Sequence, residues 1–104
     1  MLYKTEFGNY KVKAIRSTYA NNNRLAIRLM DMEDDTPVCV MTVNLVNELV
    51  GYDEHLAFVD TNNNPDIEKF IAENELGEPV GYYGVSGYCS YPLYKFNLEK
   101  LEEA

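Results

Sequence analysis

The chain has 104 residues, of which 46% are apolar and 25% charged, and its formal net charge is −8. This size and composition predict one globular domain, residues 1–104, and exclude a wholly disordered chain. The longest apolar run, Val38 to Val43, is far shorter than the ~20 residues that a membrane span needs. The first residues show no basic and then apolar leader. We therefore expect a soluble, cytoplasmic protein that does not contact a membrane.

Charge is distributed unevenly along the chain. Residues 1–30 hold six Lys or Arg and one Glu, whereas residues 31–104 hold three Lys and sixteen Asp or Glu. Such an acidic chain lacks the basic surface that nucleic-acid phosphates require, so direct nucleic-acid binding is not expected. A negative field instead attracts a protein partner with a basic surface.

Strand periodicity dominates the first sixty residues. Residues 10–15 and 24–30 alternate apolar and polar side chains, which predicts two strands that each turn one face to the core. The β-branched run Val38 to Leu45 predicts a central strand, and Leu56 to Val59 predicts a short one.

Turn-forming residues separate these strands. Gly8-Asn9 predicts a turn, Ala20 to Asn23 a loop, and Asp31 to Pro37 an acidic hairpin loop. The segment Val46 to His55 fits either a loop or a short turn of helix.

One helix is predicted from Pro65 to Leu76. Asn64 is a suitable N-cap, Pro65 fits the first helical position, and Gly77 fits a left-handed C-cap. The apolar residues at i, i+3 and i+4 that would face the core are Ile67, Phe70 and Ile71.

The last quarter of the chain completes the predicted fold. Glycines in the Tyr-rich segment Val80 to Tyr91 indicate bulges or left-handed turns, and Leu93 to Leu98 alternates as a last strand. The charged tail Glu99 to Ala104 is expected to fray. Short connections favour antiparallel pairing. We predict an α+β fold, an antiparallel sheet of five to six strands with one helix packed on one face.

Chemistry-bearing residues are few. Cys39 and Cys89 lack a CxxC spacing and are expected to be buried free thiols. The alternative, a disulfide between them, requires that their Cα atoms lie within about 7 Å. His55, beside Asp53 and Glu54, has no nucleophile at a recognisable spacing, so we expect an exposed loop histidine. No catalytic residue, metal site or cofactor is predicted, because the acidic loop lacks the turn glycine and distal Glu of a calcium loop.

Two sets of residues are candidates for binding a partner. The first is acidic and would attract a basic surface; it comprises Asp31, Glu33, Asp34, Asp35, Asp53 and Glu54. The second is the tyrosine set Tyr82, Tyr83 and Tyr88, because Tyr with Gly and Ser is typical of binding loops. The alternatives are a solvated acidic loop and tyrosine rings that cover the sheet.

The second half of the chain resembles a domain-of-unknown-function family of small acidic proteins carried by bacterial conjugative elements and phages. The segments that carry the resemblance are Ala57–Asn63, Phe70–Asn74, Leu76–Pro79, Ser86–Cys89 and Tyr91–Phe96, together with the Leu25–Leu29 strand. The resemblance implies a mobile-element context in which small acidic proteins counter host defence, some as DNA mimics and some as anti-CRISPR proteins. The family has no established catalytic residues to transfer.

Three functions remain open at this point. A non-enzymatic acidic inhibitor of a nucleic-acid-binding enzyme accounts for the charge, and an interaction module of a conjugation or replication apparatus accounts for the tyrosines. An enzyme would need a deep pocket of titratable groups around His55 or Cys89. An acidic surface that serves solubility alone is the alternative to all three.

Overall fold

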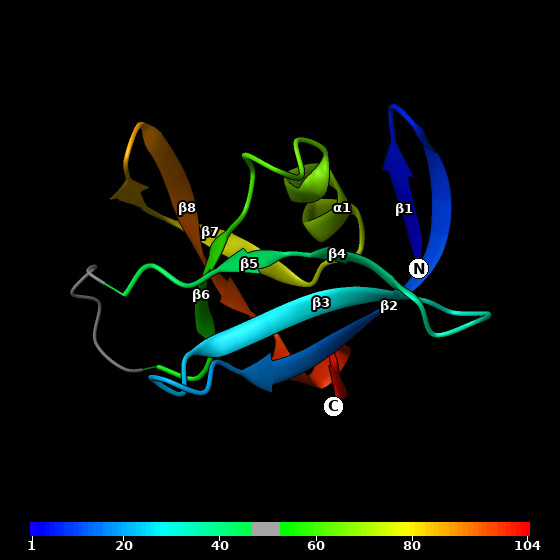
Figure 1. Cartoon of the computed structure of the whole chain (residues 1–104), viewed down its shortest axis with the longest axis horizontal. Helices are drawn as coiled ribbons and strands as arrows, with labels where there is room; N and C mark the ends of the chain where they lie inside the picture. The colour runs from blue at the N-terminus through cyan, green and yellow to red at the C-terminus, as the bar shows by residue number, and fades with distance from the viewer. Residues whose placement is uncertain (47–52) are drawn as a thin grey trace.

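The computed structural model describes residues 1–46 and 53–104, which form two β-sheets, one α-helix and one 3-10 turn (Figure 1). The first sheet has the order β1-β2-β3-β4, with β9 parallel to β2. Its strands are β1 (Leu2–Thr5), β2 (Gly8–Thr18), β3 (Leu25–Asp31), β4 (Pro37–Val40) and β9 (Glu102–Glu103). The second sheet has the order β5-β6-β8-β7. Its strands are β5 (Thr42–Val43), β6 (Leu56–Val59), β7 (Gly77–Ser86) and β8 (Cys89–Phe96). The helix is α1 (Ile67–Glu73), and the 3-10 turn is η1 (Leu98–Lys100).

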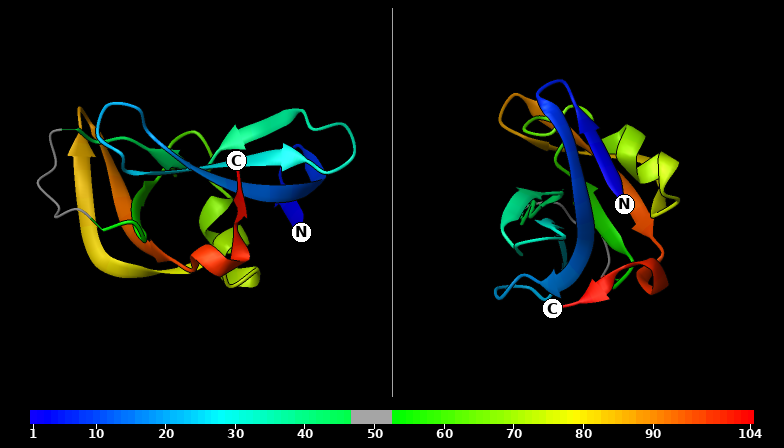
Figure 2. Two further views of the ribbon diagram at one scale, coloured as in Figure 1. Left: turned by 90° about the horizontal axis from the view of Figure 1, so that it is seen from below. Right: turned by 90° about the vertical axis from the view of Figure 1, so that its right-hand side faces the viewer.

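The α+β class is confirmed, and apart from β9 the paired strands are antiparallel. The prediction of a single sheet is wrong, because the strands divide between two sheets, which Figure 2 shows from two further sides. One hydrophobic core joins both sheets and the helix. Its members include Val12, Ala14, Leu25, Ile27, Leu29, Ala57, Val59, Ile67, Phe70, Ile71, Tyr94 and Phe96. A second, smaller cluster contains Leu45, Phe58, Tyr91 and Leu93.

The predicted central strand from Val38 to Leu45 is instead two edge strands in different sheets. Met41 marks the crossing between them. Its N–H donates to Ile27 O at 2.9 Å in the first sheet, and its carbonyl accepts from Asp60 N at 2.8 Å beside the second. The continuous β-branched pattern could not show this crossing, because both short strands have the same local preference.

The apolar face of the helix is confirmed, but its ends are not where the sequence placed them. Asn64 does not cap the helix, because its side-chain amide donates to Val40 O at 2.9 Å and to Asp60 O at 3.2 Å. The left-handed residue after the helix is Glu75, with φ 52°, whereas Gly77 opens β7. A Cβ at Gly77 would lie 2.6 Å from the carbonyl oxygen of Lys95, so glycine is needed there for close approach of two strands.

The Tyr- and Gly-rich segment forms most of the β7–β8 hairpin. Gly81, with φ 85°, lies where the register shifts between Pro79 and Tyr83, and Gly87, with φ 60°, lies in the turn. Both glycine interpretations, bulge and turn, are confirmed.

Two predicted ends of elements differ from the structure. The predicted turn at Gly8-Asn9 lies instead at Glu6 and Phe7, between β1 and β2. The tail predicted to fray forms η1 and β9, and Leu101 is buried in the core. The segment Val46 to His55 falls mainly on residues 47–52, which lie outside the described residues.

Candidate functional site

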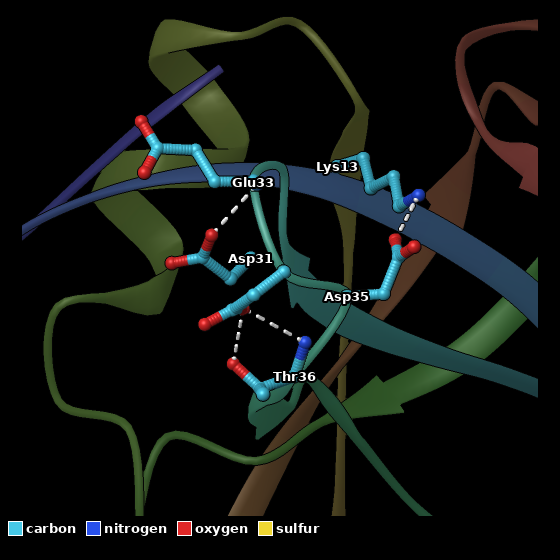
Figure 3. A network of polar contacts seen from close by, with 6 residues as sticks. Lys13, Asp31, Glu33, Asp35 and Thr36 are labelled. Atoms are coloured by element: carbon cyan, nitrogen blue, oxygen red, sulfur yellow. Dashed lines mark hydrogen bonds and ion pairs between the residues drawn. The ribbon is translucent and has the colours of Figure 1, made fainter.

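The acidic candidates Asp31, Glu33, Asp34 and Asp35 lie together on the β3–β4 hairpin (Figure 3). Side-chain hydrogen bonds shape this loop: Glu33 N donates to Asp31 Oδ1 at 2.8 Å, and Thr36 donates to Asp34 Oδ1 through its N–H at 3.1 Å and its hydroxyl at 2.7 Å. The Thr36 hydrogen bonds lower the pKa of Asp34. These hydrogen bonds hold the backbone of the loop and favour the ionised form of Asp34.

Only one carboxylate of this hairpin has a cationic partner among the described residues. Lys13 Nζ lies 2.5 Å from Asp35 Oδ1, and this hydrogen bond raises the pKa of Lys13. Figure 3 shows this contact; the Glu33 carboxylate makes no contact with the other residues drawn there. Surface ion pairs add little stability. Asp31, Glu33 and Asp34 have no cationic partner among the described residues.

Asp53 and Glu54 lie elsewhere, immediately before β6, whereas the β3–β4 hairpin lies toward the other end of the long axis (Figure 1). Asp53 accepts from His55 N at 2.8 Å and contacts His55 Nδ1 at 3.0 Å, and these hydrogen bonds lower the pKa of Asp53. Glu54 lines a separate cleft with Arg16 and Glu103, which form an ion pair. The six acidic candidates thus form two groups rather than one.

The three tyrosine candidates occupy a third place, the β7–β8 hairpin. Tyr82 is 45% exposed, Tyr83 61% and Tyr88 fully exposed at the turn. Among the described strands, β7 pairs only with β8 and is an edge of the second sheet. The rings of Tyr83 and Tyr88 are therefore presented to solvent, whereas the half-exposed ring of Tyr82 also contacts buried Phe58, with ring centroids 6.3 Å apart.

A cleft that the sequence did not predict adjoins the acidic hairpin. We name it the acidic cleft. Its volume is about 430 Å³, and it is bounded by the β1–β2 hairpin, the end of β3, β4 and the loop before α1. Strand β3 explains its position: Leu25, Ile27 and Leu29 are buried, and the next residue on the same face is Asp31. The core face of the first sheet therefore continues outward as the floor of the cleft.

The residues that line the acidic cleft are either uncharged or acidic. Burial raises the pKa of Tyr3 to about 12 and that of Cys39 to about 11, so both are uncharged near neutral pH. The charged lining residues are Glu6, Asp31 and Asp66, and no Lys, Arg or His is among the lining residues that the structure describes. The cleft is thus suited to a cationic ligand.

Sequence reasoning identified only Asp31 of these charged residues. The sequence signal for Asp31 was its position in the alternating pattern of β3, where it follows the buried residues of the core-facing side. A carboxylate at such a position indicates that this side of the strand reaches water there. Glu6 and Asp66 carry no such signal; tertiary packing alone brings them to the cleft.

The two cysteines are free thiols, as expected, but both are only partly buried rather than buried. Within residues 1–46 and 53–104, no cluster of three or more His, Cys, Asp or Glu side chains is arranged to hold a metal ion. No helix in the described part of the chain is long and apolar enough to span a membrane.

These features define a small two-sheet α+β domain with an acidic cleft and an exposed tyrosine hairpin. The chain belongs to the family described as Domain of unknown function (DUF4313), whose model matches residues 14–104. The match begins after β1, so Glu6 and the β1–β2 turn lie outside it. Neither a curated protein nor a solved structure gives a significant match to the chain.

Proposed function

We propose that this chain is a non-enzymatic, cytoplasmic acidic binding protein of a mobile element that inhibits a nucleic-acid-binding enzyme of host defence, in the manner of a DNA mimic or an anti-CRISPR protein. The observation that carries the proposal is the β3–β4 hairpin, where Asp31, Glu33 and Asp34 keep carboxylates without a cationic partner among the described residues. The net charge of −8 adds a long-range field of the same sign.

The physical basis is substitution of carboxylates for phosphates. A nuclease holds DNA in a groove of Lys and Arg, and such a groove attracts any dense array of negative charge. Charge steering raises the association rate and weakens with salt. The hydrogen bonds of Asp31 and Asp34 restrain the loop backbone, which lowers the conformational entropy lost when the loop binds a partner.

Inhibition of DNA cleavage tests this function. The purified protein is added to a guide-loaded CRISPR nuclease and, separately, to a restriction endonuclease, and cleavage of duplex DNA is measured. We expect inhibition that falls as salt rises from about 50 to about 200 mM and that is lost when the enzyme is loaded with DNA first. Absence of inhibition of both enzymes, or inhibition insensitive to salt and DNA, would contradict the proposal.

Matched variants separate local charge from total charge. Glu33→Gln/Asp34→Asn removes two charges from the hairpin, and the asparagine keeps the Oδ1 acceptor that Thr36 uses. Glu99→Gln/Glu102→Gln removes two exposed charges outside the hairpin. Weaker inhibition by the first variant alone supports the hairpin, whereas equal effects indicate a general charge effect.

A second candidate function rests on the exposed tyrosines. A protein-interaction module of a conjugation or replication apparatus would bind through Tyr82, Tyr83 and Tyr88, whose rings are exposed on an edge hairpin. Captured partners are compared between the parent chain and the Tyr82→Ser/Tyr83→Ser/Tyr88→Ser variant. Loss of a partner with the tyrosine variant, and its retention with the hairpin carboxylate variant, would favour this function over the first.

A further inference from the structure

The acidic cleft contains three carboxylates that the described residues do not neutralise. Asp31 Oδ1 accepts a hydrogen bond from Glu33 N, and the Asp31 carboxyl also interacts with that of Asp34, but it has no cationic partner among the described residues. Asp66 precedes α1 but its side chain caps no N–H group of the helix. Glu6 has no ion-pair or hydrogen-bond partner within the described parts of the chain. Negative charge in a concave site is focused by the surrounding low-dielectric wall.

Aromatic rings stand beside these carboxylates. Phe7, the second residue of the β1–β2 turn, is 86% exposed, and Tyr10 is 37% exposed, although both line the cleft. Tyr3, which is 4% exposed, lies deeper in the cleft and contacts Tyr10, with ring centroids 6.5 Å apart. The cleft therefore offers exposed aromatic surface beside its carboxylates, which a bound side chain would remove from water.

We propose that the acidic cleft receives an arginine side chain of the protein partner. This inference rests on the proposed function, since it names the group on the basic partner that this cleft recognises. The cleft, at about 430 Å³, has room for the aliphatic stem and guanidinium of one arginine and for part of its backbone. The charges complement each other, because the lining contains three acidic residues and no described cation.

Arginine fits this lining better than lysine does. Its planar guanidinium donates to more than one carboxylate in fixed directions and also stacks on aromatic rings, whereas lysine presents a compact and strongly hydrated charge. Asp31 and Asp66 line the cleft with carboxylate acceptors, and Phe7 and Tyr10 line it with aromatic rings. The methylene stem would cover the apolar side of Tyr3.

The direct test is an amide NMR titration of the full chain with N-acetyl-arginine methylamide. The uncharged citrulline analogue, which has nearly the same shape, and the lysine analogue serve as comparison probes. We expect saturable shifts at Tyr3, Tyr10 and Asp31 with a dissociation constant on the order of millimolar, the range for one small cation. Citrulline should give no saturable shift, and lysine should bind several-fold more weakly. Equal binding of arginine and citrulline, tighter binding of lysine, or shifts spread over the whole molecule would overturn the inference.

Variants of the cleft provide the second arm. Glu6→Gln/Asp31→Asn removes two charges, and the amide introduced at position 31 keeps an Oδ1 acceptor for Glu33 N, so the hairpin should fold. We expect at least about tenfold weaker arginine binding, with Glu99→Gln/Glu102→Gln unchanged. Unchanged arginine binding by the cleft variant, with dispersed amide peaks showing that it is folded, would overturn the site.

The cleft and the proposed function can fail separately. If the parent chain inhibits a nuclease and the Glu6→Gln/Asp31→Asn variant inhibits equally well, the arginine site is wrong and the function stands. If the parent chain binds the arginine probe with the expected selectivity but inhibits neither nuclease, the site stands and the proposed inhibitory function is wrong.

Discussion

Replacing Gly77 with alanine tests how the helix is joined to β7. A Cβ at this position would lie 2.6 Å from the carbonyl oxygen of Lys95, where ordinary contact begins near 3.4 Å, and 3.1 Å from the Cα of Phe96. The obstructing atoms are backbone atoms of the paired strand β8, so neither can turn aside as a side chain would. Overpacking of this kind costs about 1–3 kcal/mol, and the lower entropy of the unfolded alanine chain offsets about 0.4–1 kcal/mol. We expect Gly77→Ala to lower the free energy of unfolding by about 1–2 kcal/mol. Each kcal/mol lost should lower Tm by roughly 4–8 °C in a domain of this size.

Urea unfolding followed by far-UV circular dichroism and tyrosine fluorescence measures this loss, since the chain has no tryptophan. Two comparison variants distinguish two explanations for glycine at position 77, namely close approach of β7 to β8 and a left-handed C-cap of the helix. Asparagine adopts left-handed backbone readily, so a C-cap at Gly77 would make Gly77→Asn milder than Gly77→Ala, whereas close approach makes it no milder. Glu75→Gly relieves the positive φ at position 75 and should be neutral or stabilising. A Gly77→Ala variant as stable as the parent, with Glu75→Gly clearly destabilised, would refute the reasoning.

Three further predictions address the core, a second glycine and alkaline pH. Leu29→Ala should lower the free energy of unfolding by about 2–5 kcal/mol because Leu29 is fully buried; exposed Val85→Ala should stay within about 0.5 kcal/mol, and similar losses in urea unfolding would contradict the core assignment. Gly84→Ala should destabilise less than Gly77→Ala in the same assay, because its Cβ would meet side-chain atoms of Leu45 and Phe58, which can move. A larger loss of stability for Gly84→Ala would show that these two side chains cannot move aside. Burial raises the pKa of Tyr3 from 10.0 to about 12, so the unfolded chain ionises first and the stabilising contribution, complete below pH 10, is lost as the pH rises toward 12. At about pH 11 the free energy of unfolding of Tyr3→Phe should therefore have fallen less than that of the parent chain, by on the order of 1 kcal/mol. If the free energies of unfolding of parent and variant instead change in parallel from about pH 9 to about pH 12, Tyr3 is not buried in this way.

The candidate site shows where local sequence is informative about binding. The acidic hairpin was predicted with its four carboxylates in place, because a run of acids before a proline, between two strands, specifies both a turn and exposure. Asp53 and Glu54 were grouped with it only by charge, and the fold separates them because residues far apart in the chain are placed by packing. The acidic cleft depends on three separate segments, so no single stretch of sequence predicts it.

Local pattern determined the elements of this protein. Alternation placed β2 and β3 and the faces that they bury, and a short apolar run placed β6. The spacing of Ile67, Phe70 and Ile71 placed the buried side of the helix. These predictions succeed because burial of a periodic apolar face is the dominant stabilising contribution and it acts within one element.

Only the tertiary structure decided how the elements are distributed. The division into two sheets depends on Met41, whose N–H bonds to Ile27 in the first sheet and whose carbonyl accepts from Asp60, the residue after β6. Such backbone hydrogen bonds leave no trace in the side-chain pattern. The use of Gly77 for close approach depends on the position of Lys95 in another strand, and the paired tail depends on β2. Sequence specifies which surfaces must be buried, whereas the choice of partner for each surface is made among segments distant in the chain.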